Sequence, residues 1–264
     1  EPPGNMKLRP NRALTEPPSD VKLRSNPLPD GQRLIACDSN GLAVIASYPA
    51  GLRLWSRRVG GNPHAVELLP DGNLAVAASH GGWVRVYASS VSADADADAY
   101  AQFDLKGAHG LLWDDEWQCL WAVGDHALTA IEVAGTSEAP ILRESARGSL
   151  PLPTEGGHDL FPVGGAPNRL WVTTHAGVYQ YDKQDHAWIE AGIDRTGSQR
   201  AFVKSIGNQP SGQRVYTIPD SKRPSSAAGL YDWTTNAVQF SEPDGVRTMT
   251  GAAIYKARIW RSFA

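Results

Sequence analysis

An all-β fold made of a repeated antiparallel unit is predicted by three observations on this 264-residue sequence. Glycine (26 residues) and proline (19 residues) are frequent, which favours short strands joined by tight turns. Apolar segments alternate with turn residues through most of the chain. The third observation is a repeat. Three of these stretches begin with a glycine that is followed two or three positions later by a histidine, at His64, His109 and His158. Each of these histidines is followed 16 or 17 positions later by a second one, at His80, His126 and His175.

The clearest unit runs from His64 to Leu105. Residues 65–69 and 74–78 are predicted strands and flank Pro70-Asp71-Gly72-Asn73, a turn in which proline presets φ and glycine or asparagine accepts a positive φ. Residues 83–87 alternate as a half-buried strand, and residues 100–105 supply a fourth strand. Four antiparallel strands in about 40–45 residues are typical of one propeller blade. The sequence therefore predicts a single β-propeller.

Three further units repeat this order. The second starts at His109 and has strands at 110–113, 119–123 and 128–133. The third starts at His158 and has strands at 160–163, 170–173 and 178–181. The fourth has strands at 205–207, 214–218 and 229–233, and it begins with Lys204 where the others have a histidine.

The two ends of the chain predict how the ring closes. Residues 34–37, 42–46 and 52–55 form a blade without an innermost strand, and residues 251–255 form an innermost strand without outer ones. Joining them in one blade gives five blades and leaves no open sheet edge. Arg258-Ile259-Trp260 also resembles a second strand, which leaves a sixth blade open. We therefore expect an extended N-terminal arm at 1–30 and the propeller at 31–264.

Composition excludes several function classes. The formal net charge of −3 argues against a nucleic-acid partner, and no apolar run approaches the roughly 20 residues of a membrane helix. Cys37 and Cys119 fall in strands of different units, so we expect buried free thiols. The chain starts at Glu1 without a signal segment. That start fits both a processed exported protein, periplasmic or secreted, and a shortened chain, and we favour export.

The repeated histidines are predicted to converge. His64, His109, His158 and Lys204 stand where the chain enters an innermost strand, and His80, His126 and His175 stand at the turn after the second strand. In a propeller both positions lie on the same face, around the mouth of the central channel. Channel mouths are concave and suit ligands.

The stretch 61–90 resembles the blades of WD-repeat propellers. It has a histidine before the innermost strand, an Asp-Gly turn and an apolar second strand. This resemblance implies that the histidine holds a structural hydrogen-bond network. Two features depart from the family: only His158 directly follows a glycine, and the closing Trp-Asp pair is missing, with Asp232-Trp233 in reverse order.

Two chemistries are open if the histidines are functional. His64, His109 and His158 would bind one divalent metal such as zinc, manganese or nickel. Alternatively His109, His158 or Lys204 would act as a general acid or base, with Lys204, Lys256 or Arg258 binding an anion. The predicted architecture and its central histidines resemble propeller polysaccharide lyases, in which a base removes the proton next to a carboxylate. No complete catalytic motif supports that likeness, so it is one of fold.

We therefore predict a carbohydrate-active propeller, lyase or hydrolase, with a glycan or another small polar ligand at the channel mouth. The predicted ligand-binding residues are His64, His80, His126, His175, Lys256 and Arg258. The alternative is a non-catalytic propeller that binds a ligand or a protein partner and uses its histidines structurally.

Overall fold

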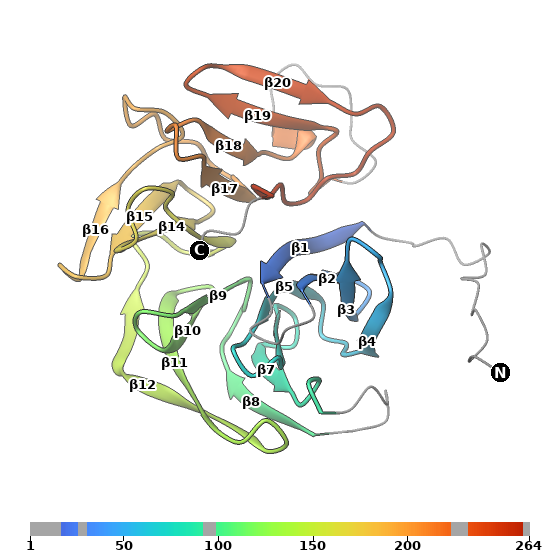
Figure 1. Ribbon diagram of the computed structural model, residues 1–264. Coiled ribbons are helices and arrows are strands. Elements are labelled where there is room, and N and C mark those ends of the chain that lie inside the picture. Colours follow the sequence, from blue (N-terminus) through green and yellow to red (C-terminus); the bar gives the residue numbers. More distant parts are fainter. Residues whose placement is uncertain (1–16, 26–30, 92–98, 223–231, 261–264) are drawn as a thin grey trace.

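The computed structural model confirms an all-β fold of five blades, each a four-stranded antiparallel sheet (Figure 1). The structure describes residues 17–25, 31–91, 99–222 and 232–260. Within each blade the strands follow chain order from the centre outward, so the innermost strands are β1, β5, β9, β13 and β17. The predicted count of five blades is therefore confirmed.

The first three blades account for the N-terminal half of the chain. Blade 1 contains β1 (Pro18–Ser25), β2 (Gln32–Asp38), β3 (Leu42–Tyr48) and β4 (Arg53–Arg58). Blade 2 contains β5 (Pro63–Leu68), β6 (Leu74–Ala78), β7 (Trp83–Tyr87) and β8 (Tyr100–Asp104). Blade 3 contains β9 (Gly110–Asp114), β10 (Cys119–Val123), β11 (Ala127–Gly135) and β12 (Pro140–Pro151).

The remaining two blades follow the same plan. Blade 4 contains β13 (Asp159–Pro162), β14 (Arg169–Thr173), β15 (Val178–Asp182) and β16 (Ala187–Glu190). Blade 5 contains β17 (Ser205–Asn208), β18 (Arg214–Thr217), β19 (Ala237–Ser241) and β20 (Gly245–Thr248), with a short 3-10 helix, η1 (Asp220–Lys222), before β19. No helix in the described part of the chain is long and apolar enough to span a membrane.

Hydrophobic cores lie between neighbouring blades rather than inside one sheet. Ile35 and Trp55 of blade 1 share a buried cluster with Val66 of blade 2, and equivalent clusters join the later blades. Trp121 is fully buried on β10, and its indole N–H donates to Asp114 Oδ2 at 3.0 Å. Each of blades 1 to 4 thus buries apolar residues against the next blade, which is the packing that the repeat requires.

The structure corrects the prediction of how blade 1 is completed. Its innermost strand is β1, which lies inside the segment 1–30 that we expected to be an extended arm; residues 1–16 and 26–30 are outside the described residues. Asp20 and Lys22 of β1 are buried. These charges on a buried strand hide the apolar alternation on which sequence prediction depends. Residues 251–255 contribute only an isolated bridge, between Thr235 and Ile254.

Residues 255–260 connect blade 5 to the other blades. Lys256 donates to the carbonyl oxygens of His64 and His109, both at 3.0 Å. Arg258 pairs with Asp20 of β1, and Trp260 packs edge-on against Tyr48 of β3 with ring centroids 5.3 Å apart. In place of the predicted shared blade, side-chain contacts of the C-terminal segment join the two ends of the described chain.

Candidate functional site

The starts of the innermost strands hold their side chains in equivalent places. The backbone N–H groups of His109, His158 and Lys204 donate to Val123, Thr173 and Thr217, the last residues of the neighbouring second strands. Lys204 therefore occupies the same repeat position as the histidines, and His64 occupies it on β5. This shared register brings the four side chains to one end of the channel.

The structure brings four histidine side chains into a row of ring contacts, which we call the imidazole row: His64, His109, His158 and His175. His64 stacks on His109 with centroids 4.3 Å apart and an interplanar angle of 22°. His109 meets His158 edge-on at 5.1 Å, and His158 lies 4.6 Å from His175. The row thus links blades 2, 3 and 4.

Two of the sequence-predicted histidines stand apart from this row. His80 and His126 are exposed, and among the described residues neither makes a ring contact with it. His126 Nδ1 lies 3.6 Å from Glu155 Oε1. Both side chains are therefore accessible to solvent.

Lys204 extends the row toward blade 5. Its Nζ lies 2.9 Å from His158 Nε2 and 5.8 Å from the centroid of the Tyr255 ring. Among the described residues it forms no ion pair with a carboxylate. Burial, together with the charges of Lys256 and Lys222, lowers the pKa of Lys204 to about 8. Within the described part of the chain, a cation without an anionic partner therefore stands at the channel mouth.

The imidazoles of the row are neutral at pH 7. Burial lowers the pKa of His64 and His158 well below the ordinary value and that of His109 to about 3. Burial, then the charge of Lys204, also lowers the pKa of His175. Neutral rings can accept hydrogen bonds from a cation, which the charged form cannot do.

Hydrogen bonds fix the tautomers of two rings. His109 Nδ1 lies 2.7 Å from the carbonyl oxygen of Gly107, so Nδ1 carries the proton and Nε2 keeps its lone pair. His158 Nε2 faces the Lys204 ammonium, so its proton is on Nδ1. That Nδ1 and His64 Nδ1 are buried and have no hydrogen-bond partner among the described residues. Two buried polar atoms are thus left for water or a ligand.

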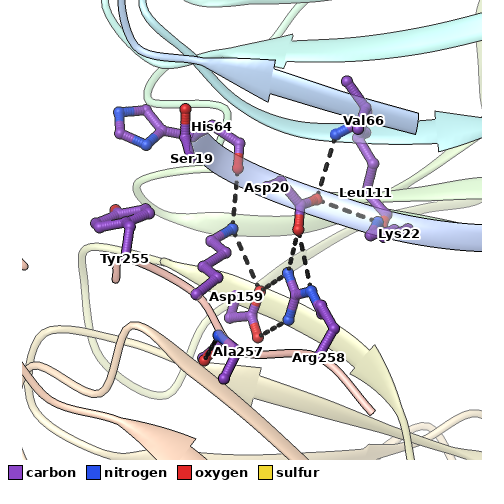
Figure 2. A network of polar contacts seen from close by, with 12 residues as sticks. Ser19, Asp20, Lys22, His64, Val66, Leu111, Asp159, Tyr255, Ala257 and Arg258 are labelled. Atoms are coloured by element: carbon purple, nitrogen blue, oxygen red, sulfur yellow. Dashed lines mark hydrogen bonds and ion pairs between the residues drawn. The ribbon is translucent and has the colours of Figure 1, made fainter. Parts of the chain in front are cut away.

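A buried ion network joins the innermost strands β1 and β13 to the C-terminal segment (Figure 2). The Arg258 guanidinium donates to both carboxylate oxygens of Asp159 at 2.7 Å and from Nε to Asp20 at 3.0 Å. Lys256 Nζ lies 3.3 Å from Asp159, and Lys22 Nζ lies 3.1 Å from Glu67. Cations and carboxylates compensate each other here, as burial requires.

This network changes the roles predicted for Lys256 and Arg258. Both were expected to bind a ligand anion, but their charges already face Asp159 and Asp20, and their side chains are 0% and 8% exposed. The roles of Asp20, Glu67 and Asp159 were not predicted from the sequence. The signal available there is a single charge within an otherwise apolar innermost strand, as at Glu67 and Asp159.

The described residues do not fit the predicted metal site. No group of three His, Cys, Asp or Glu side chains among them is arranged to hold an ion. The nearly parallel rings of His64 and His109 put their nitrogen lone pairs in nearly parallel planes. Such planes do not converge on one ion about 2 Å from each nitrogen.

The opposite end of the innermost strands is hollow. A cavity of about 750 Å³ is lined there by residues that include Ser25, Leu69, Trp113 and Val163. The cations among its lining residues are already paired, Arg24 with Glu67 and Lys183 with Asp114. None of the sequence-predicted site residues lines this cavity.

Comparisons with known proteins bear on the fold. A family model described as a family of unknown function (DUF6528) matches residues 18–262. No curated protein matches the sequence.

Three solved structures show the same fold at low sequence identity. Virginiamycin B lyase from Staphylococcus aureus is similar at a TM-score of 0.55 and 11% identity, over 88% of this chain and 84% of that one. Kuenenia stuttgartiensis hydrazine synthase gives 0.54 and 13%, over 93% and 69%. The β-propeller domain of Cps50 (Swd1) from Myceliophteria thermophila gives 0.51 and 12%, over 90% of each chain. The lyase also matches as a catalytically inactive histidine-to-alanine variant with quinupristin.

Proposed function

The chain belongs to the family of unknown function DUF6528, and we propose that its channel mouth binds a carboxylate-bearing glycan and cleaves it by elimination. The observation that carries this proposal is the contact between Lys204 Nζ and His158 Nε2 at 2.9 Å, on a lysine whose pKa is about 8. A proton-transfer group works best when its pKa is near the working pH. Lys204 meets that condition, whereas the pKa of His109, about 3, makes its imidazole a weak base.

The proposed reaction needs no group beyond the chain and its substrate. The neutral Lys204 amine takes the proton from the carbon next to the uronate carboxylate. The electron pair of that C–H bond forms a carbon–carbon double bond while the glycosidic C–O bond breaks. The Lys204 ammonium then returns its proton to the leaving oxygen, so the products are an unsaturated uronate end and a new hydroxyl end.

His158 positions the base in this scheme. Its Nε2 accepts one N–H of Lys204, which fixes the amine while leaving its lone pair available to the substrate. Virginiamycin B lyase supports this chemistry by analogy of fold only. It is a lyase of similar fold, and a variant in which one of its histidines is replaced by alanine is catalytically inactive.

The test is an assay of uronate glycans such as polygalacturonate for the ultraviolet absorbance of an unsaturated product. We expect turnover by the wild type and a loss of about 10²–10⁴-fold in Lys204→Met, the usual range for removing a general base. His186→Ala, at an exposed histidine in the turn between β15 and β16, is the control and keeps full activity. Activity in Lys204→Met close to that of the wild type would overturn the assignment.

A non-catalytic role is the second candidate, and one observation favours it for His64 and His109. His64 and His109 stack on each other, and Lys256 holds their carbonyl oxygens. In that case His109→Ala lowers the melting temperature and no uronate glycan is cleaved.

The bound metal remains a prediction. Elemental analysis of the purified wild type and of His109→Ala tests it. One equivalent of zinc, manganese or nickel, lost in the variant, would bear it out.

A further inference from the structure

Phe202 has an unusual backbone conformation beside the imidazole row. Its φ is 62°, in the left-handed region that a bulky side chain rarely adopts. The strain is held in place because its N–H donates to the carbonyl oxygen of His175 at 2.9 Å. Strained residues of this kind persist where the surrounding structure fixes them, and they cluster at ligand clamps and active sites.

The Phe202 ring is presented together with a second aromatic ring. It is half-buried, and its centroid lies 5.9 Å from that of His175, which is exposed. Gly156 lies directly beneath His175: a Cβ there would be 2.3 Å from His175 Nδ1. The glycine thus lets the imidazole lie flat against the chain. The two rings therefore lie beside each other, and His175 contacts His158, the ring that Lys204 contacts.

A cation completes this group. Lys222, at the end of η1, places its Nζ 4.9 Å from the Phe202 ring centroid, and it forms no ion pair with a carboxylate among the described residues. Its charge also contributes to the lowered pKa of Lys204. An exposed ammonium on an aromatic face is held only weakly. An anion can draw it away and free the ring for another contact.

We propose that Phe202, His175 and Lys222 form a recognition subsite for one uronate ring, with the sugar's C–H face against Phe202 and its carboxylate on Lys222. This inference rests on the proposed function, because it names what presents the substrate to Lys204. A neutral sugar leaves the Lys222 ammonium without a partner. A small anion such as acetate leaves the aromatic surface uncovered. A ring that carries a carboxylate satisfies both.

The test is binding of trigalacturonate, followed by calorimetry and by saturation-transfer NMR. Phe202→Gly removes the ring and also relieves the positive φ, so we expect the melting temperature to be kept or raised while affinity falls about tenfold. Lys222→Met is expected to lose a similar factor and to bind trigalacturonate and its methyl ester equally. The wild type binds the ester about tenfold more weakly than the acid. Tyr100→Ala, an exposed aromatic on the outer strand of blade 2, is the control and leaves affinity unchanged.

The outcomes separate this subsite from the proposed reaction. Saturation transfer to the ring protons that disappears in Phe202→Gly supports the subsite, even if no unsaturated product forms and the elimination proposal fails. Wild-type affinity in a folded Phe202→Gly variant, equal binding of glucose oligomers, or a Lys222→Met variant that still prefers the acid to the ester would each overturn the subsite.

Discussion

Replacing Arg258 by methionine is expected to destabilise the propeller more than any exposed substitution. The guanidinium makes two 2.7 Å hydrogen bonds to Asp159 and one at 3.0 Å to Asp20, and both carboxylates are fully buried. Removing one partner of a buried ion pair costs about 3–5 kcal/mol because the other charge stays buried. Lys256 and Lys22 remain 3.3 and 3.5 Å from the two carboxylates, so we expect the lower end, about 3 kcal/mol.

Urea unfolding followed by tryptophan fluorescence measures this loss. A shift of the midpoint with an unchanged m-value reports a change in stability alone. At about 2–4 °C per kcal/mol for a domain of this size, the melting temperature falls by about 6–12 °C. Arg195→Met is the matched control, since the Arg195 side chain is 74% exposed in its pair with Glu242 and such pairs contribute less than about 1 kcal/mol. A loss below about 1 kcal/mol in Arg258→Met would refute the reasoning.

The difference in stability between the wild type and Arg258→Met should depend on pH. Burial raises the pKa of Asp20, but the charges of Arg258, Lys22 and Lys256 outweigh it and hold that pKa well below its ordinary value. A depressed carboxyl pKa adds stability above the unfolded value of about 4 and loses it as the pH falls further. Because Arg258→Met lacks much of this contribution, its deficit should shrink below about pH 4. A deficit that grows in acid would contradict this assignment of charges.

Lys204, Gly156 and Lys256 each give a further expectation. As the base, Lys204 must be neutral, so kcat/KM should rise with pH and level off above about 8. The pKa of Lys204 is lower in the folded than in the unfolded protein, so the stability of the wild type should rise between about pH 8 and 10. Lys204→Met should lack this rise. Gly156→Ala, which forces a Cβ against His175 at a φ of 76°, should weaken trigalacturonate binding and shift the His175 NMR signals. Lys256→Met frees the carbonyl oxygens of His64 and His109 and should shift both imidazole signals, whereas unchanged spectra would show that Lys256 does not position the row.

Blades 2 to 4 could be predicted from the sequence because each carries its own turn residues and apolar alternation. The Pro70-Asp71-Gly72-Asn73 turn separates β5 and β6 as expected. The innermost strand β1 could not be predicted, since Asp20 and Lys22 are buried by partners far away in the chain. Arg258, which compensates Asp20, is 238 positions later, and no local pattern in the sequence reports such a pairing.

The candidate site was predictable in part because its residues belong to the repeat. The repeat indicated that His64, His109, His158 and Lys204 occupy equivalent positions, and the shared strand register places them at one end of the channel. Phe202 carries no sequence signal, because its importance lies in a backbone angle and in contacts with His175 and Lys222. Those contacts join different loops, so they exist only once the blades have packed.

A crystal structure of the protein with trigalacturonate tests the central claim most directly. We expect a uronate ring against Phe202, its carboxylate on Lys222, and the carbon that loses its proton within about 3 Å of Lys204 Nζ, the reach of a general base. Trigalacturonate bound instead in the cavity beside Trp113, at the other end of the channel, would contradict both the site and its function.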